Sequence, residues 1–503
     1  MNEKVPYIWR KNYRNEAASP EKVLETAHEQ PRAYLKRAVP TASSSPAKSS
    51  TFPVGPLNLI PDGTITGKKA SRKRCEHALE LLLTHRGNPA AEVDLILADD
   101  PQCIFAHCLR AALVVSADSH GARPSVAASV SSIEAACSDL NSAARRHASA
   151  ARAWLDGDES LASEYYGAIV IDWPHDILAL FVAHALDFRL GRRRMMRDRV
   201  AQVLPEWHSG APGFASVLAM YAFALEENGQ YRRAEKMARR ALMIDPGHPG
   251  AIHVVTHVLE MRGRAREGLA FLAATESAWA ESTGFSVHLA WHRALFQLDM
   301  DDPASALATY DAQIVNAHTS GMSVLADASA LLWRLQLQDI EVGSRWQQLA
   351  DHWQTKALAG ARPFYVVHAM IAFAAAGRTA AAGQLLEAFS HTHATSASLS
   401  IPEEALVAPF CEALLAFVGK DYPACIGLLT RVQHIAHRCG GSLAQCDLIH
   451  LTFTEAALRA RKEHLARALV AERATQKPTS RLNRLLQRRL RTMVPLIATT
   501  TSP

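Results

Sequence analysis

Long hydrophobic runs are the first thing that this sequence lacks. No stretch approaches about 18 consecutive apolar residues, the length that a membrane-spanning helix needs, although hydrophobic residues make up 49% of the chain. The first residues, MNEKVPYIWRKNYRNEAASPEK, hold no apolar core of signal-peptide length. These absences argue against a membrane protein, and we expect a soluble protein that works in the cytoplasm.

A strong excess of one charge is also missing. The chain has 54 Lys and Arg against 49 Asp and Glu, a formal net charge of +5. Dedicated nucleic-acid binders carry a larger basic excess, interleaved with aromatic residues on the binding face. Aromatic residues are only 7% of this chain, and its basic clusters, such as Arg192–Arg194, are typical of solvated helix faces. We therefore expect no nucleic-acid partner.

Paired cysteines and the usual catalytic signatures are absent as well. The chain has eight cysteines, none in a C-x-x-C pair, a pattern that favours reduced, buried thiols over disulfides or a thiolate metal site. It contains no G-x-S-x-G nucleophile elbow, phosphate-binding P-loop or dinucleotide-binding glycine fingerprint. No familiar enzyme class is therefore indicated by motif.

What the sequence does have is a recurring helical-hairpin pattern, clearest in Phe214–Pro246. Small residues stand there where two helices would cross, a glycine stands at the turn, and a proline closes the second helix. The turn glycine Gly229 is followed 34 residues later by Gly263. This spacing resembles a tetratricopeptide repeat (TPR), and about nine such units follow one another. The further turns are predicted at Gly157, Gly191, Asp301, near Gln338, at Gly377, at Gly419 and near Arg461.

The pattern predicts an all-α fold, a right-handed superhelix of TPR-like hairpins with a central polar groove. The sequence leaves open whether this superhelix closes on itself. We expect four regions: an N-terminal extension (1–36), a Ser/Pro-rich linker (37–67), the TPR-like solenoid (68–495) and a disordered tail (496–503).

The most suggestive side chains lie in AIHVVTHVLEM. His253, His257 and Glu260 follow one another at i, i+4 and i+7, so they share one stripe of a predicted helix. SVHLAWHRAL repeats the spacing with His288 and His292. The repeat register places the first three residues and His288 on the concave face, with His292 nearer the hairpin core. His147 occupies the same register as His253 in an earlier unit.

Imidazoles and a carboxylate on adjoining helices suit acid/base chemistry or a divalent metal. We take His253, His257 and Glu260 as candidate catalytic residues. If a metal is bound, its ligands would be His253, His257 and His288. H-x-x-x-H without a glutamate after the first histidine is a weak motif. A polar ligand pocket and histidines that only pack in the fold are the alternatives, so we expect no cofactor in preference to a divalent metal.

Other polar residues stand singly in apolar segments. Asp327 is the lone carboxylate of VLADASALLWRL, and it needs a His or Arg partner or a place in a site. His184 and His368 are isolated in the same way, which is more typical of packed histidines. In RCGGSLAQCD, Ser442 and Gln445 form a capping box, with anion binding by the helix start as the alternative reading.

These segments resemble the tetratricopeptide repeat protein 38 family from about Pro101 to about Ser480. The family pattern is H-x-x-x-H-x-x-E, then H-x-x-x-H, then D-A/S-S, then G-G-S-x-A-Q-x-D. The chain departs from it at Leu289-Ala290-Trp291 and at Cys446. The resemblance implies the repeat fold and a shared set of polar residues. Those residues are His253, His257, Glu260, His288, His292, Asp327, Ser329, Ser442, Gln445 and Asp447, with His107, His147, His184 and His368 as further matches.

Two functions remain. The first is a binding protein that holds a small molecule or partner segment in a groove lined by His and Glu, and we rank it first because the fold alone supports it. The second is an enzyme of small-molecule metabolism that uses the same groups as acid/base groups or metal ligands. The sequence does not decide the oligomeric state. The candidate ligand-binding residues are His147, His288, His292, Asp327, His368, Ser442, Gln445 and Asp447.

Overall fold

The computed structural model describes residues 69–315, 321–356, 358, 361–393 and 404–493. All of them belong to one compact unit, Leu57–Pro503. The predicted extension (1–36), linker (37–67) and tail (496–503) lie outside the described residues, and those boundaries stay predictions. None of the described helices is both long and apolar enough to span a bilayer.

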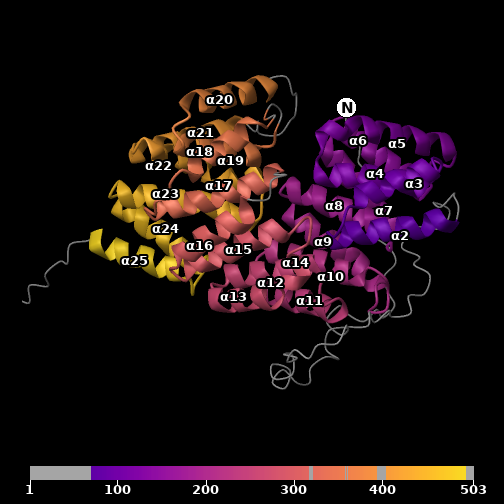
Figure 1. Ribbon diagram of the computed structural model, residues 1–503, viewed down its shortest axis with the longest axis horizontal. Coiled ribbons are helices and arrows are strands. Elements are labelled where there is room, and N and C mark those ends of the chain that lie inside the picture. Colours follow the sequence, from indigo (N-terminus) through magenta and orange to yellow (C-terminus); the bar gives the residue numbers. More distant parts are fainter. Residues whose placement is uncertain (1–68, 316–320, 357, 359–360, 394–403, 494–503) are drawn as a thin grey trace, which may run out of the picture. The chain divides into compact units, whose positions relative to one another are not determined.

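The described residues form an all-α solenoid of consecutive helical hairpins, as the repeat pattern predicts (Figure 1). The first half contains α2 (Lys69–Thr84), α3 (Pro89–Asp99), α4 (Ile104–Ala117), α5 (Arg123–Ala136), α6 (Ala143–Leu155), α7 (Glu159–Asp172), α8 (Ile177–Arg189), α9 (Arg193–Val203), α10 (Phe214–Glu227), α11 (Tyr231–Ile244), α12 (Pro249–Met261) and α13 (Ala265–Ala274). The second half contains α14 (Glu276–Trp279), α15 (Ser286–Asp299), α16 (Pro303–Thr309), α17 (Met322–Leu337), α18 (Arg345–Gln354), α19 (Pro363–Ala375), α20 (Thr379–His393), α21 (Glu404–Val418), α22 (Tyr422–Val432), α23 (Leu443–Arg459), α24 (Glu463–Gln476) and α25 (Arg481–Met493).

The predicted turns between paired helices are confirmed, because each has a residue in the left-handed region. At Gly229, for example, φ is +72°, a conformation that glycine adopts without strain. In two turns the left-handed residue is not a glycine and lies one position after the expected one. It is Asp339 rather than Gln338 in the first, and Lys420 rather than Gly419 in the second. The left-handed residues of these hairpins are Gly157, Gly191, Gly229, Gly263, Asp301, Asp339, Gly377, Lys420 and Arg461.

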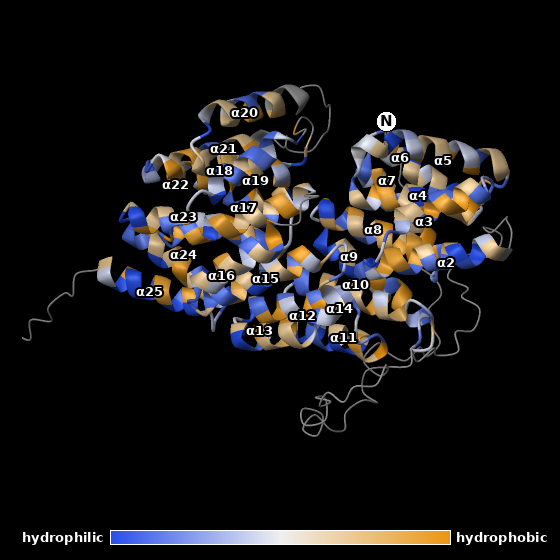
Figure 2. Ribbon diagram, viewed as in Figure 1, coloured by the Kyte–Doolittle hydropathy of each residue, from blue (hydrophilic) through white to orange (hydrophobic). Residues whose placement is uncertain are grey.

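The first helices of successive hairpins form one layer, in which α8, α10, α12, α15, α17, α19 and α21 each pack on the next. Each of these helices also packs on the second helix of its own hairpin, which is in turn α9, α11, α13, α16, α18, α20 or α22. Small residues allow close crossing within a hairpin, and Ala222, Ala234 and Ala241 are completely buried between α10 and α11. Most of these helices carry both polar and apolar residues (Figure 2).

The last hairpin, α23 and α24, packs on helices that are not its neighbours in the repeat order. α23 packs on α22, but also on α17 and α12, which lie far earlier in the chain, and α25 packs on α15. Trp333 Nε1 donates to Thr452 Oγ1 at 2.9 Å, which joins α17 to α23. Thr479 Oγ1 donates to the Arg262 carbonyl at 2.6 Å, which joins the end of the hairpin to the end of α12. The C-terminal hairpin is thereby held against the middle of the chain.

Candidate metal centre

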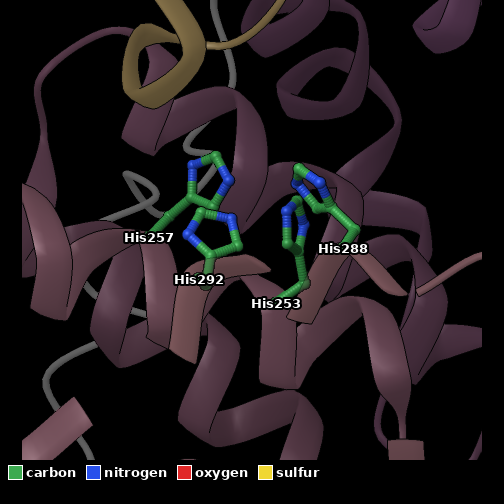
Figure 3. Close-up of side chains that lie close together, drawn as sticks. All are labelled: His253, His257, His288 and His292. Atoms are coloured by element: carbon green, nitrogen blue, oxygen red, sulfur yellow. The ribbon is translucent and has the colours of Figure 1, made fainter. Parts of the chain in front are cut away.

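Four histidines from two neighbouring helices converge on one point (Figure 3). His253 and His257 are one turn apart on α12, so their rings lie on the same face. His288 and His292 repeat this on α15, which packs on α12. One ring nitrogen from each of the four lies within 4.8 Å of the others. Each of the two helices thus contributes two imidazoles, one helical turn apart, to a common centre.

Three of the four rings are oriented by carboxylates. His292 Nδ1 lies 2.7 Å from Glu260 Oε2, and His288 Nδ1 lies 2.7 Å from Asp327 Oδ2. His257 Nδ1 lies 3.3 Å from Glu226 Oε2. A carboxylate on one ring nitrogen fixes the ring and directs the other nitrogen elsewhere, as it does behind metal-ligating histidines. The lone carboxylate Asp327 therefore has the partner that the sequence requires.

Three ring nitrogens of the cluster are left without partners. Nε2 of His253, His257 and His292 is buried, and within the described part of the chain it has no hydrogen-bond partner. The side chains of His257 and His292 are completely buried. An unsatisfied buried polar atom costs about 1–3 kcal/mol, so three at one point indicate that something else completes the site. A metal ion is the smallest group that would satisfy them together.

Protonation of the buried rings is opposed by their surroundings. Burial lowers the pKa of His257 to about 4 and that of His292 to about 3, in both cases against the pull of neighbouring carboxylates. Burial and then the three neighbouring imidazoles hold the pKa of His253 well below its ordinary value. At neutral pH these three rings are neutral, which is the form that ligates a metal.

His288 differs from the other three. Burial opposes its charged form, but the Asp327 carboxylate outweighs burial and raises the pKa of His288 above its ordinary value. Its side chain is 18% exposed, whereas those of His257 and His292 are not exposed at all. His288 therefore marks the side on which the cluster comes nearest to solvent.

The orienting carboxylates have further partners of their own. Lys477 Nζ lies 3.0 Å from Glu260 Oε1, and Gln445 Nε2 donates to Asp327 Oδ1 at 3.2 Å. Burial alone would raise the pKa of Glu260, but Lys477 and His292 outweigh it and hold that pKa well below the usual range. Glu260 is thus ionised at neutral pH and able to accept from both of its partners.

Glu226 and Glu227 form a second acidic group on the far side of His257, with ligand atoms of all three within 4.8 Å. Burial raises the pKa of Glu226 to about 8 and that of Glu227 to about 7. Arg193 Nε donates to Glu227 Oε2 at 2.9 Å. The simplest role for Glu226 is to orient His257.

A small cavity of about 50 Å³ adjoins the centre behind Glu260. Arg334, Asp447, Arg473 and Lys477 contribute its charged lining. A buried water needs about 10–15 Å³ on this scale. The cavity therefore has room for a few waters and is too small for an organic ligand.

The remaining predicted residues have other places. His147, on α6, has its Nε2 2.9 Å from Asp176 Oδ2. His368, on α19, donates from Nδ1 to the Phe364 carbonyl at 2.7 Å. Neither histidine belongs to the four-histidine group. Ser442 and Gln445 form the predicted capping box at the start of α23. Asp447 binds Arg473 and Lys477 instead of facing the imidazoles.

His292, which the repeat register places nearer the hairpin core, is a full member of the cluster. The inserted helix α14 lies between α13 and α15. An insertion of this kind rotates the following helix relative to the repeat, so a register counted along the sequence does not carry across it.

Sequence reasoning missed Glu226, Glu227 and Lys477. The two glutamates end an otherwise apolar helix in FALEENG, and that position was the available signal. Lys477 has no such signal, because it lies after α24 and reaches Glu260 across 217 positions.

Comparisons with known proteins add little to this description. No protein-family model matches the chain. The chain is similar to a solved structure described as Naa15/Naa10 bound to HypK-THB, at 12% identity and a TM-score of 0.23, over 82% of this chain and 64% of that one. It is also similar to the crystal structure of the P58(IPK) TPR domain, at 12% identity and a TM-score of 0.20, over 70% of this chain and 98% of that one.

The chain thus spans less than two thirds of the first of these structures. At TM-scores this low the two superpositions establish neither a shared fold nor a shared function. The description as a solenoid of helical hairpins rests on the chain's own helices and turns.

Proposed function

We propose that this chain is a metalloprotein that binds one divalent transition-metal ion between α12 and α15. The ligands are the unblocked ring nitrogens of His253, His257, His288 and His292. The observation that carries the proposal is the convergence of four imidazole nitrogens within 4.8 Å, three of the rings being held through Nδ1 by carboxylates. This replaces the preference for no cofactor that the sequence alone suggests.

The spacing fits a single ion after small movements. Zinc binds four ligands in a tetrahedron with imidazole nitrogen at about 2.0–2.1 Å, so two ligand nitrogens stand about 3.3 Å apart. Nitrogens separated by up to 4.8 Å reach that distance when each of the two side chains moves by up to about 0.8 Å. A set made only of imidazoles, with any proton on His288 released as the metal binds, suits zinc, copper, iron or nickel, and does not suit magnesium or calcium, which prefer oxygen.

We further propose that the chain belongs with the tetratricopeptide repeat protein 38 family. Residues of the shared pattern that lie far apart in sequence take part in one network. Asp327, for example, bonds both His288 and Gln445. A network of this kind supports a common site over unrelated packing positions.

Catalysis is the second candidate, because one side of the cluster approaches solvent. His288 is 18% exposed. A metal there would act as a Lewis acid or activate a water, and Glu260 and Asp327 would keep the ligating rings in the correct tautomer. The groups first taken as acid/base residues, His253, His257 and Glu260, would then be ligands and a ring-orienting carboxylate. Ligand or partner binding in a concave groove stays a prediction of the repeat fold.

Metal content tests the proposal. The full chain, stripped with a chelator and reloaded with Zn²⁺, should retain about one equivalent by plasma mass spectrometry. A His257→Ala/His292→Ala variant should retain none while remaining helical. His184→Ala/His368→Ala removes one half-buried and one buried histidine that lie outside the cluster, and it should retain zinc as the parent does. Equal zinc in the parent and in the cluster variant would overturn the proposal.

A further inference from the structure

The C-terminal hairpin (residues 443–480) touches the outer side of the histidine cluster at three places. Each contact reaches a carboxylate that orients a histidine, or the neighbour of such a carboxylate. The sequence separations are 118 positions for Gln445 and Asp327, 217 for Lys477 and Glu260, and 216 for Leu443 and Glu227. A segment at the far end of the chain therefore supports a site built in its middle.

The contact at Asp327 leaves little freedom to either side chain. Asp327 Oδ2 holds His288 at 2.7 Å, while Oδ1 accepts from Gln445 Nε2 at 3.2 Å. Gln445 is itself fixed, because its Oε1 accepts from the backbone N–H of Ser442 at 3.0 Å. The start of α23 thus sets the plane of the carboxylate that orients His288.

The contact at Glu260 is an ion pair. Glu260 Oε2 holds His292 at 2.7 Å, and Oε1 lies 3.0 Å from Lys477 Nζ. Lys477 is also 3.3 Å from Asp447 Oδ2, which in turn accepts from Arg473. The side chains of Glu260 and Lys477 are 8% and 7% exposed, so the charges interact with little screening by water.

The contact at Glu227 is less direct. The backbone N–H of Leu443 donates to Glu227 Oε1 at 3.1 Å. Glu227 adjoins Glu226, whose Oε2 lies 3.3 Å from His257 Nδ1. The first turn of α23 thus offers one of its free amides to an internal carboxylate, as helix N-termini do to anions.

These bonds exceed what docking of the hairpin needs. The hairpin is already fixed by Trp333 with Thr452, and by Arg459 Nη2, which donates to the Leu337 carbonyl at 3.0 Å. Those contacts lie on α17 and touch none of the histidines or their carboxylates. A hairpin that only packed would have no need of a buried lysine and a half-buried side-chain amide bonded to the two carboxylates.

We propose that Lys477 and Gln445 are positioning residues of the metal centre, and that docking of the C-terminal hairpin and binding of the metal reinforce each other. This inference rests on the proposed function. Lys477 and Gln445 do not touch the metal; they fix the carboxylates that fix the imidazoles. Such outer partners change metal affinity by about 10- to 100-fold when they are removed.

Zinc titration of the metal-free full chain against a competing chelator tests the inference, with five variants. Lys477→Met removes the charge, and Lys477→Arg restores it. Gln445→Glu keeps the acceptor of the capping box but loses the amide that donates to Asp327. Ser442→Ala is its matched control, because it loses the cap and keeps that amide. Arg459→Met is a control for docking alone.

We expect Lys477→Met and Gln445→Glu to bind Zn²⁺ about 10- to 100-fold more weakly, and Lys477→Arg to recover part of the loss. Ser442→Ala and Arg459→Met should bind as the parent does, even where their melting temperatures fall. When Co²⁺ replaces Zn²⁺, its visible absorption bands should be shifted in Lys477→Met and Gln445→Glu, and not in the controls Ser442→Ala and Arg459→Met. Parental affinity in both Lys477→Met and Gln445→Glu would overturn the inference, and Gln445→Glu decides it if Lys477→Met fails to fold. A parent chain that binds no zinc would instead overturn the proposed function.

Discussion

Lys477 and Glu260 form a buried ion pair with 3.0 Å between Nζ and Oε1, although 217 positions separate them in the chain. The other oxygen of Glu260 holds His292. One carboxylate therefore joins the last hairpin of the solenoid to the histidine cluster in its middle. Such a pair is costly to desolvate, and breaking it by removing one partner costs more than replacing both. Because Glu260 also contacts His292, we infer that the ion pair serves to hold that histidine in position as well as to pack the hairpin.

The turn at Gly263 should be more sensitive to a side chain than the equivalent turn at Gly229. Both glycines have positive φ, +64° and +72°. A Cβ at Gly263 would lie 2.6 Å from both the Ser480 nitrogen and Thr479 Oγ1, whereas one at Gly229 would meet nothing within 4 Å. Gly229→Ala should cost about 1–2 kcal/mol from the backbone conformation alone.

Gly263→Ala should cost more and should also loosen the end of the C-terminal hairpin. Urea unfolding measures the first effect, and hydrogen exchange at the amides of residues 477–483 measures the second. Equal losses in the two variants, with unchanged exchange, would show that the close approach at Gly263 has no energetic role.

Asp187 should be a strong determinant of stability outside the site. Its side chain is completely buried, lies 2.7 Å from Arg199 Nε and accepts from Ser163 Oγ at 2.6 Å. Asp187→Ala leaves the guanidinium of Arg199 buried without its counter-ion, and should lower the free energy of unfolding by about 3–5 kcal/mol.

Asp198→Ala is the control, because Asp198 pairs near the surface with Arg194, whose side chain is 86% exposed. It should cost less than about 1 kcal/mol in the same urea titration. Similar losses in the two variants would contradict the assignment.

Stability should fall as the pH drops from about 6.5 toward 4. Burial lowers the pKa of His184, His248 and His368 to about 4 from an ordinary value of 6.5. Between these values the unfolded chain binds protons that the folded chain does not, so protonation favours unfolding. Each histidine adds a slope of about 1.4 kcal/mol per pH unit.

His248 allows this prediction to be separated from other titrations. Its Nδ1 accepts from the Ala251 amide at 3.2 Å as the N-cap of α12. His248→Asn keeps an N-cap acceptor and removes the titrating ring, so its stability should vary less with pH than that of the parent. Urea unfolding of metal-free protein at pH 7, 6 and 5 gives the comparison. A parent whose stability is flat across this range would contradict the shifted values.

The carboxylate behind His288 should affect metal affinity more than folding. Asp327→Asn keeps the shape but loses the charge that accepts from His288 Nδ1. We expect zinc affinity to fall about 10- to 100-fold. Asp351→Asn changes a carboxylate that is 61% exposed and pairs with Arg378, and it should leave zinc affinity unchanged. Equal affinity in the two variants would remove Asp327 from the site.

Local periodicity in the sequence predicts which side chains share a face of a single helix. The i, i+4 spacing of His253 and His257 places both rings on one face of α12, and turn residues such as Gly229 set the hairpins. Asp327, a lone carboxylate among apolar residues, had to find a partner, and His288 is that partner. These predictions need only helix geometry and the cost of burying a charge.

What lay beyond prediction depends on packing between distant helices. Nothing near Lys477 in the sequence indicates that α23 folds back onto α12 and α17. The membership of His292 required knowing how α15 is rotated after α14, and the role of Glu226 required knowing which face of α10 meets α12. Both are settled by side-chain packing that a single sequence does not encode locally.

X-ray absorption spectroscopy of the zinc-loaded full chain tests the central claim most directly. Four imidazole nitrogens at about 2.0–2.1 Å, with the outer-shell scattering of imidazole rings and no sulfur, are the predicted result. The spectrum of a His257→Ala/His292→Ala sample should lose this signature. A first shell of oxygen or sulfur, or a chain that retains no zinc, would contradict the four-histidine metal centre.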